Sequence, residues 1–161
     1  MSLVRRALPE DAPEVLRLRQ VMLDSVSGGG GGDAGTWHEE SLPTLRARLA
    51  DPDGTFAAFV VDHPERPGAL AALAVGTAEY RIGRETNPHG VVGFVFSVAT
   101  DPGTRRRGYA RACMDGLLAW FRERGARQVQ LTASADARPL YEALGFQPKP
   151  DPLMELRLGD A

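Results

Sequence analysis

The stretch "VATDPGTRRRGYARACM", residues 98–114, decides how the rest of the chain is interpreted. An apolar run ends at a DPG turn, and Arg105, Arg106 and Arg107 then lead into a new segment with regularly spaced apolar residues. Three consecutive arginines are unexpected in a chain with a formal net charge of −2 and a sequence pI of about 5.9. The question is whether this junction holds an anion.

A helix is predicted after the arginines, as far as about Arg124. One apolar stripe at helical spacing supports it, formed by Ala110, Cys113, Met114, Leu117, Leu118 and Phe121. Thr104 is the expected N-cap, because its hydroxyl can accept a hydrogen bond from an amide two or three residues further on. The arginines would then lie in the first turn, where cations oppose the helix dipole.

A docked anion would resolve this conflict, because free amides, the dipole and guanidinium groups would all attract it. Gly108 has no Cβ and would let a bulky phosphate approach the backbone closely. The alternative is a set of solvated arginines at the start of a helix, since charge clusters are often surface features.

Helical and strand patterns alternate along the rest of the chain, so we predict a single α/β (α+β) domain over residues 1–161. The expected strands are residues 3–8, 55–62, 69–82, 91–100, 127–133 and 153–158, and the expected helices are residues 9–23, 37–50, 104–124 and 136–146. Residues 28–35 are glycine-rich, and we expect a flexible loop there, because glycine runs lose much entropy in any regular element.

The composition excludes several classes of function. The acidic balance argues against broad nucleic-acid binding, which needs a basic surface. Cys113 is the only cysteine, so no internal disulfide is possible, and its place on the apolar stripe predicts a buried thiol. No signal peptide or long apolar run occurs, so we expect a cytoplasmic protein without membrane contact. Isolated histidines and the missing P-loop argue against a metal site and triphosphate chemistry.

Two motifs carry a family resemblance. Arg105-x-x-Gly108-x-Ala110 resembles the R/Q-x-x-G-x-G/A signature of the GCN5-related N-acetyltransferases, the GNAT superfamily, which binds the pyrophosphate of acetyl-coenzyme A there. "SADARPLYEALGF", residues 134–146, resembles the later motif N-x-x-A-x-x-L-Y-E-x-L-G-F, with Ser134 in the place of asparagine. The resemblance covers almost the whole chain. It implies a single mixed, mostly antiparallel sheet of six to seven strands, splayed at its centre and flanked by about four helices.

The resemblance also implies direct transfer of an acetyl group from acetyl-coenzyme A to a primary amine of a small molecule or peptide. Backbone groups of Val98, Ala99 and Thr100 would pair with the pantetheine like an added strand, and we take the Val98 amide as the oxyanion donor. The other implied cofactor-binding residues are Arg105, Arg106, Arg107, Gly108, Tyr109, Ala110, Arg111, Ser134 and Tyr141.

Tyr141 is the expected general acid, because a phenol with an ordinary pKa of about 10 stays protonated at neutral pH and can protonate a departing thiolate. The alternative is a core tyrosine. Glu79, Glu85 and His89 are candidates for the general base, and the sequence does not choose among them. A non-catalytic coenzyme A-binding module is the rival function. The last expected strand, residues 153–158, could pair with another subunit in a homodimer.

Overall fold

The fold is taken from a computed structural model, which describes residues 2–26 and 35–159. The expected flexible loop lies outside these residues except for Gly35, which is the first residue of a helix. The elements in chain order are β1 (Arg5–Arg6), η1 (Pro9–Asp11), α1 (Ala12–Val26), α2 (Gly35–Leu49), β2 (Phe56–Asp62), β3 (Leu70–Tyr80), β4 (Val91–Thr100), η2 (Pro102–Thr104), α3 (Tyr109–Glu123), β5 (Gln128–Leu131) and α4 (Arg138–Ala143).

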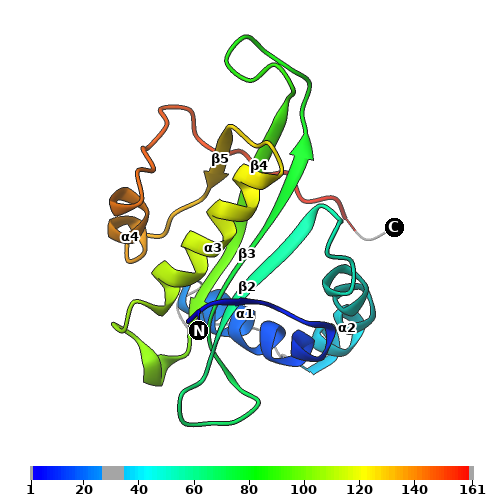
Figure 1. Cartoon of the computed structure of the whole chain (residues 1–161), viewed down its shortest axis with the longest axis vertical. Coiled ribbons are helices and arrows are strands. Elements are labelled where there is room, and N and C mark those ends of the chain that lie inside the picture. Colours follow the sequence, from blue (N-terminus) through cyan, green and yellow to red (C-terminus); the bar gives the residue numbers. More distant parts are fainter. Residues whose placement is uncertain (1, 27–34, 160–161) are drawn as a thin grey trace.

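One mixed sheet organises the chain, with its strands in the order β1-β2-β3-β4-β5 (Figure 1). Strands β1 to β4 are antiparallel, and β5 lies parallel to β4. A parallel pair needs a long crossover, and here α3 supplies it. The mixed α/β architecture is therefore confirmed.

The predicted count of six to seven strands is wrong, because the described sheet has five. The segment 153–158, expected to be the last strand, is extended and exposed and pairs with no described strand. Its alternating sequence favours a strand, but a strand forms only where a neighbouring edge accepts its hydrogen bonds.

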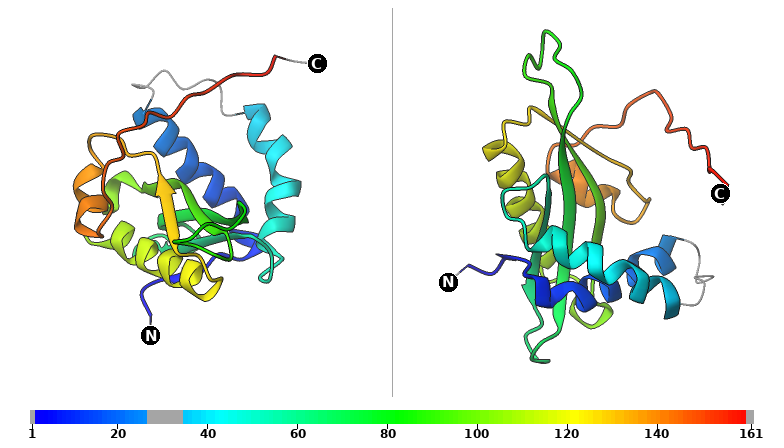
Figure 2. Two further views of the ribbon diagram at one scale, coloured as in Figure 1. Left: turned by 90° about the horizontal axis from the view of Figure 1, so that it is seen from above. Right: turned by 90° about the vertical axis from the view of Figure 1, so that its right-hand side faces the viewer.

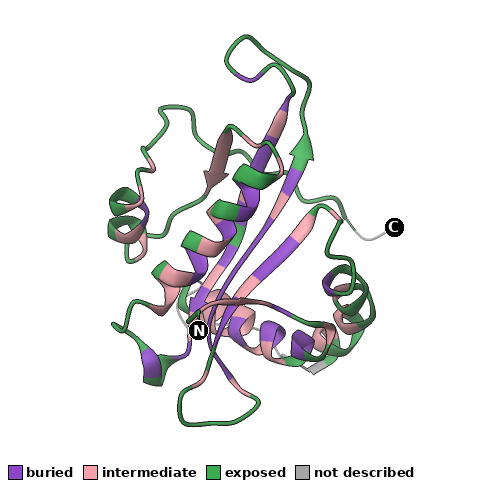
Figure 3. Cartoon of the chain, in the orientation of Figure 1, coloured by how far each residue is buried: buried purple, intermediate pink, exposed green. Residues whose placement is uncertain are grey.

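Helices cover both faces of the sheet (Figure 2). One apolar core lies between the sheet and the α3–α4 side, and it includes Met114, Leu117 and Tyr141. The other lies between the sheet and the α1–α2 side, and it includes Leu18 and Leu73. Both faces of β2, β3 and much of β4 are buried in this way, which explains their continuous apolar sequences (Figure 3).

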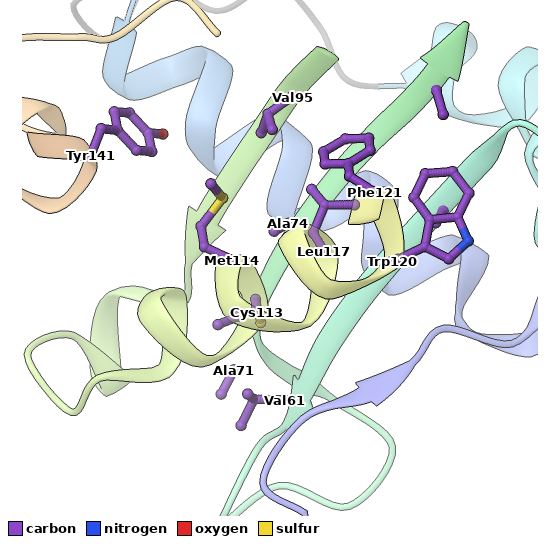
Figure 4. Packing of buried hydrophobic residues seen from close by; sticks show 13 residues of the cluster. Val61, Ala71, Ala74, Val95, Cys113, Met114, Leu117, Trp120, Phe121 and Tyr141 are labelled. Carbon is purple, nitrogen blue, oxygen red and sulfur yellow. The ribbon is translucent and has the colours of Figure 1, made fainter. Parts of the chain in front are cut away.

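The α3 helix packs its apolar stripe directly on the strands, with Leu117 fully buried and Phe121 almost so (Figure 4). Two glycines make this close approach possible. A Cβ at Gly76 or at Gly93 would lie 2.7 Å from an atom of the Phe121 ring. Cys113 is also buried in this core, and burial raises the pKa of its thiol to about 12, as expected for an unreactive cysteine.

We predict that Leu117→Ala lowers the free energy of unfolding by about 2–5 kcal/mol, because a fully buried leucine leaves a cavity when it is truncated. Urea unfolding followed by circular dichroism would measure it. The control is Glu123→Ala, an exposed change on the same helix, for which the expected shift is within about 0.5 kcal/mol. Equal effects from both variants would contradict this packing of α3.

Candidate active site

The β4 strand has an open edge on the side that faces β5. Its register with β5 runs only from Val92, opposite Gln128, to Val95, opposite Leu131. Residues 97–100 stay paired with β3, and residues 96–100 have no described strand on the other side. The backbone groups on that side are therefore free to pair with an extended ligand.

A β-bulge marks the point where the two strands part. Val95 pairs with Gly76 and Ser97 pairs with the adjacent Val75, so Phe96 is an extra residue in β4. A bulge bends its strand and increases the local twist, which turns the second half of β4 away from β5. Val98, Ala99 and Thr100, the residues expected to pair with pantetheine, all lie beyond it. The structure thus places them on the open edge.

The sequence predicts that the three arginines lie in the first turn of α3, but this prediction is wrong. They precede the helix in a turn, residues 105–108, which we call the arginine loop. Thr104 is not the N-cap either. Its hydroxyl donates to the carbonyl oxygens of Ala71 and Asp101, at 3.2 and 3.1 Å, so it fastens η2 to β3. The N-cap is Gly108, which makes no side-chain cap.

The conformation of the arginine loop is unusual at two residues. Arg106 has a φ of 66° and Gly108 a φ of 78°, both in the left-handed region. A Cβ at Gly108 would meet no atom within 4 Å, so the space in front of the α3 N-terminus is open. Because no side chain caps the helix, its first amide groups remain available to an anion.

The charges of this loop have no partner in the described parts of the chain. Arg105, Arg106 and Arg107 are exposed, and no described carboxylate lies within ion-pair distance of any of them. In the first turn of α3, Tyr109 packs against the core and Ala110 is half-buried. Arg111 forms an ion pair with Asp115, with 3.9 Å between its Nε and the carboxylate Oδ1. The loop is therefore a concentration of free positive charge beside the open edge of β4.

Asp101 anchors the junction between β4 and η2, directly before the arginine loop, and sequence reasoning missed this role. It is 5% exposed, and its carboxylate accepts hydrogen bonds from Arg17 on α1 at 2.7 Å and from Arg66 at 3.0 Å. It also accepts from the Gly103 amide at 3.3 Å, and its own amide donates to the Ala71 carbonyl at 2.7 Å. The end of β4 is thus tied to α1, to the β2–β3 connection and to η2.

The pKa of Asp101 shows that these contacts outweigh the cost of burying the charge. Burial alone would raise the pKa, but the hydrogen bonds from Arg17 and Gly103 and the charges of Arg17 and Arg66 lower it below the ordinary value. No local pattern marks this role of Asp101, since an aspartate before Pro-Gly is typical of a turn and its arginine partners are 84 and 35 residues away.

Tyr141 lies on α4 with its ring in the core, 6% exposed. Figure 4 shows the ring projecting from α4 toward β4 with the hydroxyl leading. No hydrogen bond joins this hydroxyl to another described residue, and the Phe146 ring packs 5.9 Å away. Burial raises the pKa of Tyr141 above its ordinary value, which keeps the phenol protonated. Both expectations, a core ring and a proton donor, fit this placement.

Ser134 is exposed and lies before α4, where its hydroxyl accepts from the Ala137 amide at 3.3 Å. It therefore supports the start of this short helix in the way that a capping serine does. A contact with the cofactor remains a prediction for this residue.

The three candidates for the general base lie in two places. Glu79 is on β3 and shares its carboxylate with Arg81, which in turn donates to Gln130 on β5 at 3.0 Å. Glu85 and His89 are exposed in the β3–β4 connection, beyond the ends of both strands. By strand alternation from Leu73 and Val75, Glu79 points to the α1–α2 side of the sheet.

Two further contacts on that side involve the bulge. Arg19 of α1 donates to the hydroxyl of Ser97, which is 3% exposed, and the ring of Phe96 lies 6.1 Å from that of Phe56.

The residues 2–26 and 35–159 include no cluster of side chains suited to a metal ion. No helix among them is long and apolar enough to cross a bilayer.

The chain resembles known proteins both in its sequence and in its fold. The model of the acetyltransferase (GNAT) family matches residues 18–146. A mycothiol acetyltransferase of Beutenbergia cavernae is 39% identical over 64 residues, which is 38% of this chain but 22% of that relative. The chain therefore matches less than a quarter of the length of this relative.

Two solved structures share the fold over nearly their whole length. A predicted acetyltransferase with acetyl-CoA from Clostridium acetobutylicum is 24% identical, with a TM-score of 0.78 over 98% of this chain and 96% of that one. A GCN5-related N-acetyltransferase from Ralstonia eutropha JMP134 is 25% identical, with a TM-score of 0.75 over 95% and 97% of the two chains.

We predict that Asp101→Asn lowers the free energy of unfolding at pH 7 by about 1–3 kcal/mol, the usual cost of removing hydrogen bonds to a buried charge. The pKa of Asp101 is lowered by folding, so its contribution is present above the ordinary carboxyl pKa of about 3.9 and is lost as the pH falls through the folded value. The difference between wild type and variant should therefore shrink in acid. Urea unfolding at pH 7 and pH 3 measures it, and a difference independent of pH would contradict this role.

Proposed function

Because the chain belongs to the acetyltransferase (GNAT) family, we propose that it is an enzyme that moves an acetyl group from acetyl-coenzyme A to a primary amine of a small molecule or peptide. The observation that carries the proposal is the open edge of β4 directly before three arginines that have no acidic partner in the described part of the chain. The open strand edge can pair with an extended chain, and the arginines can bind phosphate groups. A molecule that combines an extended chain with phosphates therefore suits this surface.

The residues present fit such a co-substrate. The arginine loop and the uncapped amides of α3 would hold the pyrophosphate, since each supplies donors to negatively charged oxygens. Val98, Ala99 and Thr100 would hydrogen-bond the pantetheine through their backbone. Asp101 would act as a positioning residue, because it fixes the point where the strand ends and the loop begins.

The transfer itself needs few side chains. The amine nitrogen attacks the thioester carbonyl carbon, the new C–N bond forms, and the C–S bond breaks. A backbone amide on the open edge, for which we take Val98, would donate to the carbonyl oxygen as it gains negative charge. The hydroxyl of Tyr141 would protonate the departing sulfur. The nitrogen loses one proton to a base.

Glu79 is the base that the geometry favours among the three candidates. It lies on β3 inside the sheet, with its side chain on the same side as the bulge residues Phe96 and Ser97. Glu85 and His89 lie beyond the strand ends. Glu79 pairs with Val92, and Phe96 lies four residues further along β4, which is about 13 Å at strand spacing, so Glu79 would act through intervening water.

We predict that Tyr141→Phe lowers kcat by a factor of about 10²–10⁴ and leaves the KM for acetyl-coenzyme A nearly unchanged, as expected for the loss of a general acid alone. The ring remains, so packing against Phe146 is kept. Steady-state assays of thiol release with a panel of amines would measure both constants. Unchanged kcat with a fully active wild type would remove Tyr141 from the mechanism.

We also predict that Arg106→Glu combined with Gly108→Glu abolishes measurable binding of acetyl-coenzyme A. Each lost charged hydrogen bond costs about 1.5–3 kcal/mol, which is roughly tenfold or more in affinity, and the new charges repel phosphate. Isothermal titration calorimetry is the measurement, with Arg122→Glu, an exposed change near the other end of α3, as the control that should bind normally. Failure of well-folded wild type to bind would refute the proposed function.

A further inference from the structure

Two arginines of α1 reach the second half of β4 and its end, and they differ in their partners. Arg17 donates through Nε and Nη2 to the carboxylate of Glu14, at 2.7 and 3.0 Å, and through Nη1 to Asp101 at 2.7 Å. Arg19 donates through Nη1 to the hydroxyl of Ser97, which carries no charge. Among the described residues, Nε and Nη2 of Arg19 have no acceptor, and no carboxylate lies within ion-pair distance of this side chain.

The position of Arg19 makes this unpaired charge significant. The residue is half-buried, and a guanidinium that is partly removed from water is most stable beside an anion. Nε and Nη2 form one planar edge of the guanidinium, and this edge can bind both oxygens of a carboxylate. Arg17 has that arrangement with Glu14, two residues away on the same helix. A ligand that brings a carboxylate would complete Arg19 in the same way.

The contact with Ser97 places Arg19 beside the reacting end of the co-substrate. Ser97 directly precedes Val98, whose amide we take as the donor to the thioester carbonyl. Tyr141 belongs to the core on the α3–α4 side of the sheet, so the departing sulfur would be protonated from that side. The amine would then attack from the opposite side, where α1 carries Arg19 and where Glu79, the favoured base, also points.

An aromatic surface adjoins this guanidinium. Phe96, the extra residue of the bulge, is 38% exposed, and its ring lies 6.1 Å from that of Phe56 on β2. Phe56 packs against the core on the α1–α2 side, so both rings lie on the side of the sheet that Arg19 faces. Arg81, just after β3, is already neutralised by Glu79 at 2.6 Å. This side of the sheet therefore offers an unpaired guanidinium next to exposed aromatic surface.

We propose that the acceptor is a primary amine that carries a carboxylate a few bonds from its nitrogen, as an amino acid does, and that Arg19 selects it. The carboxylate would accept hydrogen bonds from Nε and Nη2 of Arg19, and the apolar part of the acceptor would lie against Phe96. Ser97 would act as a positioning residue, because it holds Nη1 and so fixes the direction of the other donors. The inference rests on the proposed function, since the reacting carbonyl defines where the amine must lie.

Matched pairs of acceptors test this selection. Each pair is an amino acid and its carboxamide, namely phenylalanine with phenylalaninamide and leucine with leucinamide, and thiol release from acetyl-coenzyme A is measured with the full chain. Arg19→Met should lower kcat/KM for the carboxylate member by about 10- to 100-fold, because charged hydrogen bonds are lost, and for the carboxamide by about threefold or less. Arg122→Met, an exposed change on α3, is the control that should alter neither value.

A second variant separates recognition from a merely structural role. Ser97→Ala keeps the guanidinium but frees its direction, so it should give a smaller loss that is again confined to the carboxylate member. If Arg19 only tied α1 to β4, Arg19→Met and Ser97→Ala would lower the values for both members alike, and that result would overturn the inference. Circular dichroism and calorimetric titration with acetyl-coenzyme A should be unchanged in both variants, which shows that the fold and the co-substrate site are intact.

The proposed function and this inference fail in different ways. A well-folded wild type that does not bind acetyl-coenzyme A would refute the proposed function. A wild type that binds it but acetylates only amines without a carboxylate, or no member of either pair, would refute the selection by Arg19 alone.

Discussion

The hydrogen bonds between β4 and β5 stop at Val95 and Leu131, and the site depends on this limit. A strand inside a sheet normally satisfies its backbone groups on both sides, and leaving them unpaired in a buried position is costly. Here the bulge at Phe96 turns β4 away, so five residues keep one open edge within the body of the protein. The simplest use for such an edge is a ligand that pairs with it as a strand would.

The remaining elements can be understood as supports for that opening. On one side, α3 packs so closely on β3 and β4 that Gly76 and Gly93 are needed beneath Phe121. On the other side, α1 contacts β4 through Arg19 and Ser97, and it contacts Asp101, the residue after β4, through Arg17. These contacts fix the second half of β4 and the start of η2, which leads into the arginine loop. The free charges of that loop then lie at the end of the open edge.

Much of this arrangement could be predicted from the sequence, because it follows from local patterns. The bounds of β4 were predicted to the residue, and the apolar stripe of α3 was confirmed, since hydrophobic periodicity reports directly on burial. The family that two short motifs predict is confirmed by the match of its model to residues 18–146. The wrong predictions are those that depend on tertiary pairing. Thr104 bonds to β3 instead of capping α3, and residues 153–158 do not form a strand in the single chain.

The contacts that shape the site could not be found in this way. The bulge at Phe96 is a shift of one residue in register, and no local pattern in "VFSVAT" marks it. Asp101 gains its role from Arg17 and Arg66, which are distant in sequence.

Hydrogen exchange of the backbone amides, followed by mass spectrometry with and without coenzyme A, tests the central claim most directly, because it reads the open edge itself. If the ligand pairs with β4 and its phosphates lie on the arginine loop, exchange should slow in peptides covering residues 96–110 and stay unchanged in β2. Binding without protection of these residues, or with protection confined to another part of the chain, would contradict the claim that this edge is the cofactor site.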